Sequence, residues 1–128
     1  MRATPLSVWA HKLSTAKIEE VTKYDVSMTH SHQACVVAVS AYNVAIAHLI
    51  NNLGDRKGAI EAVAKYLKES GDADVKEWFE EAMNAKDESE MISASPHKIG
   101  WIRIAFTFSF YFLKQGYSFE KTIEVMLW

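Results

Sequence analysis

Two histidines that stand two residues apart are the first candidates for chemistry in this sequence. His30 and His32 flank Ser31, immediately before a long helical pattern. Residues at i and i+2 do not share a helical face. At a loop-to-helix junction, however, both imidazoles can point into one pocket, as hydrogen-bond donors or as ligands of a transition metal. No third ligand has a recognisable metal-site spacing, so the alternative is that Thr29 or Ser31 caps the helix and the histidines are partly exposed.

Three aspartates supply the oxygen ligands that magnesium prefers, namely Asp25 and the close pair Asp72 and Asp74. The close pair comes just before a helical pattern, where carboxylates stabilise the positive end of the helix dipole. We therefore predict that this pair has a structural role. The other histidines are scattered and are assigned no site: His11, His48 and His97.

Trp101 is the tryptophan with a setting that suits a ligand. It follows Gly100 after a loop that contains serines and Pro96, so that its ring and the neighbouring backbone can both meet a bound molecule. Trp9 and Trp78 fall within helical patterns, where tryptophans are more often core residues. The sequence contains no phosphate-binding glycine loop, nucleophile elbow or zinc motif.

Composition excludes several classes of protein. The chain has 128 residues, 49% of them hydrophobic and 23% charged, which predicts one globular domain. Its formal charge of −2 provides no basic field for nucleic acid. The single cysteine, Cys35, cannot form an internal disulfide and is expected to be a small buried hydrophobe. No apolar run reaches the roughly 18–20 residues of a membrane span, and residues 1–5 lack the apolar segment of a secretory signal. We expect a soluble cytoplasmic protein without nucleic-acid or membrane partners.

Helices are expected to position the candidate residues, because glycine and proline are scarce and lie at the edges of periodic segments. The polar stretch from Asn84 to Pro96 is expected to be a connecting loop, and the alanine-rich pattern from Ala34 to Leu49 is expected to be central. The predicted helices run from Pro5 to Trp9, from a cap at Ser14 or Thr15 to Met28, from Ser31 to just before Gly54, from Arg56 to Ser70, from a cap at Asp72 or Asp74 through Ala82, from Gly100 to Leu113, and from Phe119 to Trp128.

One segment also fits a strand. Phe106, Phe108, Phe110 and Phe112 alternate with smaller or polar residues, a period of two that favours β-structure. As a helix, the same segment is apolar nearly all round and needs neighbours on most sides. No second strand is evident to pair with it, and a lone strand cannot satisfy its backbone groups. We therefore predict a helix and an all-α fold.

Four segments, taken in order, resemble the ADP-ribosylglycohydrolase family. Met1–Leu6 is similar to the family's Met-Arg-x-x-Pro segment, and Ser27–His32 to its Leu-Thr-His segment, which precedes a long alanine-rich helix. Ile99–Phe106 resembles the Gly-aromatic-Val segment that opens a late core helix. Ser118–Trp128 resembles the Ser-Phe-Glu helix that comes next. Each motif is weak alone, but their order and spacing extend over the whole chain.

The resemblance implies a compact all-helical bundle and an activity. Family members remove ADP-ribose from modified side chains or conjugates, using two magnesium ions held by two acidic segments. One of those segments lies upstream of the Met-Arg motif, and the other follows the helix that ends here at Trp128. Neither is present in this sequence. We therefore expect the domain to be incomplete at both ends, to bind no magnesium, and to be inactive alone.

The same resemblance implies which residues contact substrate. His30, preceded by Thr29, is expected to lie against the ribose next to the scissile bond. Met1 and Arg2 are expected at the end of the loop that binds the diphosphate and ribose, and Gly100 and Trp101 are expected to line the same cleft. The expected ligand is ADP-ribose or an ADP-ribosylated substrate, bound weakly.

Two other readings stay open. The chain can be a non-catalytic helical interaction module that pairs with itself or with a partner through exposed apolar residues, with Phe119, Ile123 and Leu127 as the candidates. It can also bind a transition metal through His30 and His32.

Overall fold

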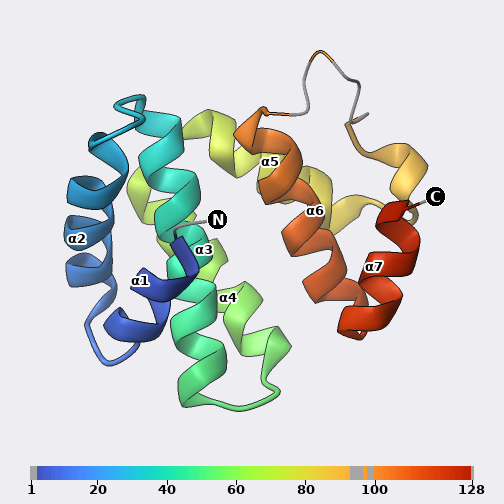
Figure 1. Cartoon of the computed structure of the whole chain (residues 1–128), viewed down its shortest axis with the longest axis horizontal. Coiled ribbons are helices and arrows are strands. Elements are labelled where there is room, and N and C mark those ends of the chain that lie inside the picture. The colour runs from blue at the N-terminus through green and yellow to red at the C-terminus, as the bar shows by residue number, and fades with distance from the viewer. Residues whose placement is uncertain (1–2, 93–96, 98–99, 128) are drawn as a thin grey trace. The chain divides into compact units, whose positions relative to one another are not determined.

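The structure is a computed structural model that describes residues 3–92, 97 and 100–127. These residues form seven α-helices and one short 3-10 helix, with no strand among them, which confirms the predicted all-α fold (Figure 1). The elements are α1 (Ala3–Ala10), α2 (Thr15–Ser27), α3 (Gln33–Asn51), α4 (Arg56–Ser70), α5 (Ala73–Asn84), the 3-10 helix η1 (Glu88–Glu90), α6 (Ile102–Gln115) and α7 (Phe119–Leu127).

Polar side chains start the helices by accepting hydrogen bonds from backbone N–H groups of the first turn. The Ser14 hydroxyl accepts from Lys17 N at 3.4 Å, as one of the two predicted caps of α2. Asp72, and not Asp74, caps α5, where its carboxylate accepts from Val75 N at 3.0 Å. Ser118 caps α7 in the same way, accepting from Lys121 N at 3.1 Å. Each cap satisfies a backbone donor that has no partner within the helix.

Glycine ends two helices at the places that the sequence predicts. Gly71 after α4 and Gly116 after α6 have φ angles of 71° and 70°, in the left-handed region. Residues with a side chain rarely adopt this conformation, so glycine is the residue that most readily ends a helix there. The predicted stop at Gly71 and the predicted stop at Gly116 are both confirmed.

Several predicted boundaries need correction, beginning with α1, which starts at Ala3 and not at Pro5. The polar stretch expected to be a loop contains η1, because the Asp87 carboxylate accepts a hydrogen bond from Ser89 N at 2.9 Å and so caps a short helical turn. The helix expected to begin at Gly100 begins at Ile102, after the extended residue Trp101. Residues 93–96 of the predicted loop, Met1 and Arg2, and Trp128 lie outside the described residues.

The described residues divide into two compact units, Met1–Glu77 and Trp78–Trp128. In the first unit α3 is the central helix, as predicted, and it packs against α1, α2 and α4 (Figure 1). Small side chains allow that close approach: Ala34, Ala38, Ala41 and Ala45 are all buried. Cys35 is only half-buried, not buried as expected.

Helix α3 is long and apolar enough to cross a membrane by its length and composition. The expectation that no apolar stretch reaches this length is therefore wrong for α3, because the few polar residues within it leave the stretch apolar on average. In the structure 56% of this stretch is buried against other parts of the chain. Packing in a helical core accounts for its apolar composition.

The second unit is built on aromatic contacts between the end of α5 and α6. Phe79 meets Phe110 edge-to-face, with ring centroids 5.2 Å apart, and Phe106 lies 4.7 Å from Phe110. The Lys114 ammonium donates to the carbonyls of Met83 and Ala85, at 3.1 and 2.7 Å, and so satisfies acceptors at the end of α5.

Candidate functional site

The Thr29–His30 segment forms a short connection between α2 and α3. The N–H groups of both residues donate to the carbonyl of Val26, at 3.0 and 2.8 Å, which completes the last turn of α2. His30 Nδ1 lies 2.9 Å from the Thr29 hydroxyl. Both side chains are exposed. This contact orients the imidazole and leaves Nε2 to meet a ligand.

His32 caps α3, which corrects the expectation that Ser31 or Thr29 does so. The Nδ1 atom of His32 accepts a hydrogen bond from Ala34 N at 3.3 Å. Nδ1 must carry a lone pair to accept, so the neutral ring holds its proton on Nε2. Neither nitrogen of His32 then presents a lone pair to a metal. Capping and metal binding by His32 therefore compete, which weakens the transition-metal reading.

Gly100 and Trp101 lie in the second unit, directly before α6. Gly100 is exposed, and a Cβ built on it would meet nothing within 4 Å. Trp101 packs edge-to-face on Trp78, with centroids 6.4 Å apart, and is 40% exposed. The Arg103 guanidinium carbon lies 5.7 Å from the centroid of the Trp101 ring, within the range of a cation–π interaction.

The structure brings together some of the predicted site residues. Thr29 and His30 are in contact in the first unit, and Gly100 adjoins Trp101 in the second. Met1 and Arg2 lie outside the described residues. A single cleft that contains all six stays a prediction.

The described residues do not provide a dimagnesium site. No group of three or more His, Cys, Asp or Glu side chains among them is arranged to hold a metal ion. Asp72 is committed to capping α5, as described above, and Asp74 lies in the first turn of the same helix. The predicted structural role of this acidic pair is thereby confirmed for Asp72 in atomic detail.

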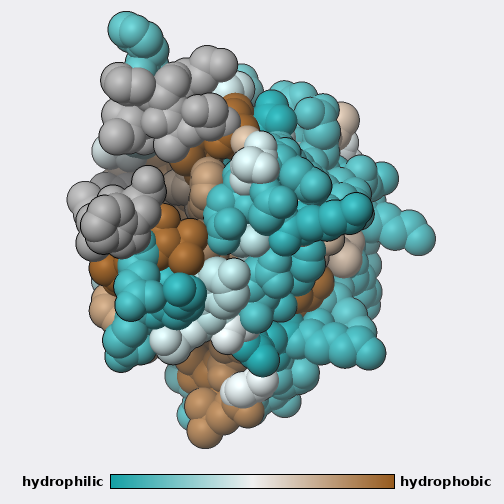
Figure 2. Space-filling model, turned by 90° about the vertical axis from the view of Figure 1, so that its right-hand side faces the viewer, coloured by the Kyte–Doolittle hydropathy of each residue, from teal (hydrophilic) through white to brown (hydrophobic). Residues whose placement is uncertain are grey.

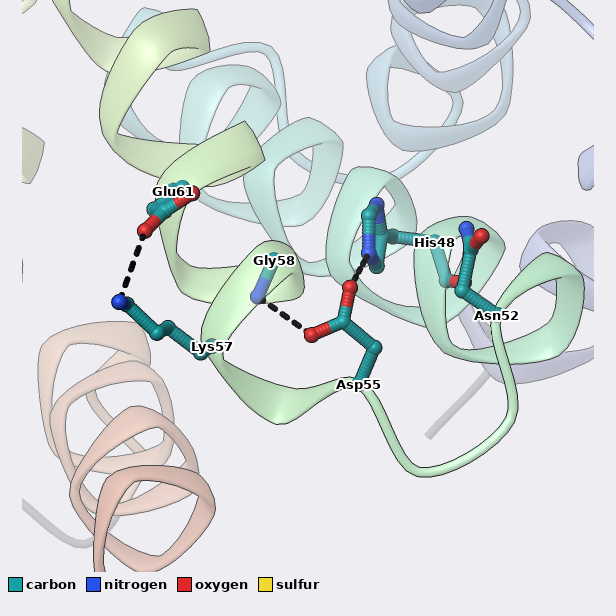
Figure 3. A network of polar contacts seen from close by, with 6 residues as sticks. All are labelled: His48, Asn52, Asp55, Lys57, Gly58 and Glu61. Carbon is teal, nitrogen blue, oxygen red and sulfur yellow. Dashed lines mark hydrogen bonds and ion pairs between the residues drawn. The ribbon is translucent and has the colours of Figure 1, made fainter.

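A polar cluster that the sequence analysis missed joins α3 to α4. Asp55 Oδ2 lies 2.8 Å from His48 Nε2, and Asp55 Oδ1 accepts from Gly58 N at 2.9 Å (Figure 3). Two signals in the sequence point to this cluster: an aspartate directly before a helical pattern, and a lone glycine inside one. Neither signal predicts that Asp55 pairs with His48, seven residues earlier, because that contact depends on how the turn between α3 and α4 folds.

These contacts make Asp55 a stronger acid. The hydrogen bond with His48 lowers the pKa of Asp55, and the hydrogen bond from Gly58 N–H lowers it further. Because the pKa of the folded state is the lower one, ionised Asp55 favours folding above the pKa of the unfolded chain. This contribution is lost as the pH falls through the pKa of the folded state.

Gly58→Ala is expected to gain none of the stability that alanine normally gives a helix, about 1 kcal/mol. A Cβ on Gly58 would overlap the Asp55 carboxylate and lie 2.5 Å from His48 Nε2. The Asp55 side chain must swing away, which breaks both of its contacts. In an Asp55→Ala background only the far end of the His48 side chain has to move, so the same substitution is expected to recover most of that stability. Urea denaturation of the two single variants and the double variant measures this difference, and additive effects would contradict it.

A buried chain of hydrogen bonds, also missed from the sequence, ties three helices of the first unit together. Ser7 Oγ on α1 donates to Asn43 Oδ1 on α3 at 2.6 Å, and Asn43 Nδ2 donates to Thr22 Oγ1 on α2 at 2.8 Å. All three side chains are fully buried. These bonds join α1 and α2 to α3. They therefore help to hold together the two helices, α2 and α3, whose connection carries Thr29 and His30.

Comparison with known proteins bears on this arrangement of residues. The model of the ADP-ribosylglycohydrolase family matches residues 1–127, almost the whole chain. No curated protein and no solved structure matches the chain. The family match covers all four segments that carry the resemblance, and the all-helical structure agrees with it. The chain therefore belongs to the ADP-ribosylglycohydrolase family.

Proposed function

We propose that this chain binds ADP-ribose, and that its part in the family's magnesium-dependent hydrolysis is to orient the substrate. The observation that carries the proposal is the exposed imidazole of His30, held by Thr29 at the α2–α3 connection. It stands in the Thr-His segment that resembles the family's substrate-binding motif. The free ring nitrogen, Nε2, can make one hydrogen bond with a ribose hydroxyl.

Orientation alone does not hydrolyse a glycosidic bond. One hydrogen bond contributes about 1 kcal/mol net, whereas enzymes lower their barriers by about 8–23 kcal/mol. Two magnesium ions, when bound in family members, activate water and stabilise charge on the departing ribose. The described residues lack a group of carboxylates for those ions. We therefore propose that hydrolysis requires carboxylates from outside this sequence.

His30→Ala is expected to weaken ADP-ribose binding about fivefold, the equivalent of one hydrogen bond. Isothermal titration calorimetry with ADP-ribose measures the effect. Ser31→Ala, at the exposed neighbouring position, is the matched control and should bind like the wild type. Unchanged affinity in His30→Ala would place the site elsewhere. Turnover of an ADP-ribosylated peptide by this chain with Mg²⁺ alone would contradict the proposed need for further carboxylates.

A second candidate function is self-association through α7, and the exposure of one stripe of that helix favours it. Phe119, Ile123 and Met126 follow one another at helical spacing and are 78%, 40% and 64% exposed. Figure 2 shows hydrophobic atoms between hydrophilic ones on one face of the molecule. The side chain of Leu127, also predicted for this surface, lies outside those described.

Phe119→Ser is expected to abolish any dimer that forms through this stripe, because a large aromatic side chain contributes much of the apolar area of such a contact. Size-exclusion chromatography with light scattering measures the mass of wild type and variant across a concentration series. Tyr24→Ser, at a similarly exposed aromatic residue on α2, is the control. A monomeric wild type at all concentrations would remove this candidate.

A further inference from the structure

The Glu81 carboxylate on α5 uses both of its oxygens to hold the chain on either side of Trp101. Its Oε1 accepts a hydrogen bond from Ile92 N at 2.7 Å. Its Oε2 accepts from Arg103 Nη2, also at 2.7 Å. The two side chains of the ion pair are only 17% and 22% exposed. Charge-assisted hydrogen bonds of this length are among the stronger ones in proteins, and partial burial shields them from competing water.

The position of Glu81 on α5 connects it to Trp101 by two routes. Trp78 lies three residues earlier on the same helix and therefore on the same face, and it packs directly against the Trp101 ring. Glu81 holds Arg103, whose guanidinium lies beside the same ring. One face of α5 thus holds the Trp101 ring in two ways: Trp78 packs against it directly, and Glu81 holds the Arg103 guanidinium beside it.

Trp101 is held by these contacts and yet keeps 40% of its surface exposed. A side chain that is both ordered and exposed loses little conformational freedom when a ligand binds, and binding is stronger for that reason. Glu81 itself is mostly covered, so it can act on a ligand only through Arg103 and Trp101. Trp101 can therefore contact a ligand directly, whereas Glu81 can only hold Trp101 in position.

We propose that Glu81 is a positioning residue that holds Trp101, through Arg103, in the orientation in which Trp101 contacts bound ligand. The proposal rests on the ADP-ribose binding proposed above and adds to it the residue that arranges the Trp101 surface. Glu81 belongs to neither the resemblance motifs nor the predicted site. Its role follows from the two hydrogen bonds of its carboxylate and the position of Trp78 on the same helix face.

Glu81→Gln tests the Arg103 route selectively. The amide oxygen can still accept from Ile92 N, but the uncharged group that replaces the other oxygen no longer accepts from Arg103. In protein labelled with 5-fluorotryptophan, the ¹⁹F resonance of Trp101, assigned with Trp101→Phe, is expected to shift or broaden. The resonance of Trp9 on α1 should stay unchanged. ADP-ribose affinity, measured by calorimetry with the wild-type protein as reference, is expected to fall about fivefold.

Arg103→Gln breaks the same ion pair from the other side and should change the Trp101 resonance in the same way. If Glu81 acts through Arg103, the double variant should be no more perturbed than Arg103→Gln alone. Glu61→Gln, a substitution of the same kind in an exposed pair with Lys57 on α4, should leave both the resonance and the affinity unchanged.

The outcomes distinguish this proposal from the function on which it rests. A Trp101 resonance that does not move in folded Glu81→Gln and Arg103→Gln would overturn the positioning role alone. Wild-type ADP-ribose affinity in Trp101→Phe would overturn the proposed contact between Trp101 and ligand, and the positioning role with it. A moved resonance together with weakened binding in Glu81→Gln and in Trp101→Phe would support both.

Discussion

Replacing Phe110 with alanine is expected to lower the free energy of unfolding by about 3–5 kcal/mol, the usual cost of removing a fully buried aromatic side chain. Phe110 is 1% exposed and contacts two other rings, Phe79 and Phe106. Truncation removes both ring contacts and leaves a cavity that the two remaining rings cannot fill without leaving their own positions. Urea denaturation followed by far-UV circular dichroism measures the loss.

Phe108→Ala is the matched control, because it removes the same side chain two residues away. Phe108 is only half-buried and contacts Phe112 with ring centroids 6.0 Å apart. We expect it to cost clearly less than Phe110→Ala. Equal costs for the two variants would contradict the helical packing of this segment, because only a strand places Phe106, Phe108, Phe110 and Phe112 on one face.

The same segment illustrates why the fold was predictable from the sequence, and on what basis. Its local pattern has a period of two and favours a strand. A helix was favoured for a reason that is not local: the sequence offers no evident partner strand to satisfy the backbone of a strand. The structure pairs Phe106 with Phe110, and Phe108 with Phe112, at the i, i+4 spacing of a helix. Backbone hydrogen bonding therefore outweighed side-chain periodicity.

Helix ends were predictable where one residue type decides them. The glycine stops at Gly71 and Gly116 depend on a left-handed backbone that glycine adopts most readily. The cap of α3 was less predictable, because serine and threonine are the usual choices and the structure uses the ring nitrogen of His32 instead. That choice depends on how the chain enters the helix and not on capping preference alone.

Sequence motifs predict only those parts of the candidate site that are formed by residues adjacent in the sequence. The Thr29–His30 contact joins sequence neighbours, and a motif is enough to find it. The contacts of Asp55 with His48 and of Glu81 with Arg103 join residues seven and 22 positions apart. Such pairs require knowledge of which turn folds back or which helix faces which. No periodicity in a single sequence carries that information.

Asn43→Ala is expected to destabilise the first unit by about 2–4 kcal/mol, more than its size suggests. The side chain is fully buried and donates to one hydroxyl while accepting from another. Each lost hydrogen bond costs about 1 kcal/mol, and each buried group left without a partner adds about 1–3 kcal/mol if water cannot replace it. Alanine leaves the buried Thr22 hydroxyl without this donor, whereas the Ser7 hydroxyl keeps the Ala3 carbonyl, 3.0 Å away, as a second acceptor.

A substitution at a partner tests whether the network, and not the lost volume, sets this cost. If the hydrogen bonds dominate, Asn43→Ala should cost less when Thr22 has already been replaced by valine, because no hydroxyl is then left without the donor that Asn43 Nδ2 provides. Asn84→Ala, at an exposed residue at the end of α5, should change stability by no more than about 0.5 kcal/mol. Strictly additive costs at Asn43 and Thr22 would instead assign the loss to packing. The connection that carries His30 follows α2 and precedes α3, so loosening the Asn43 network should also weaken ADP-ribose binding without any change at the site itself.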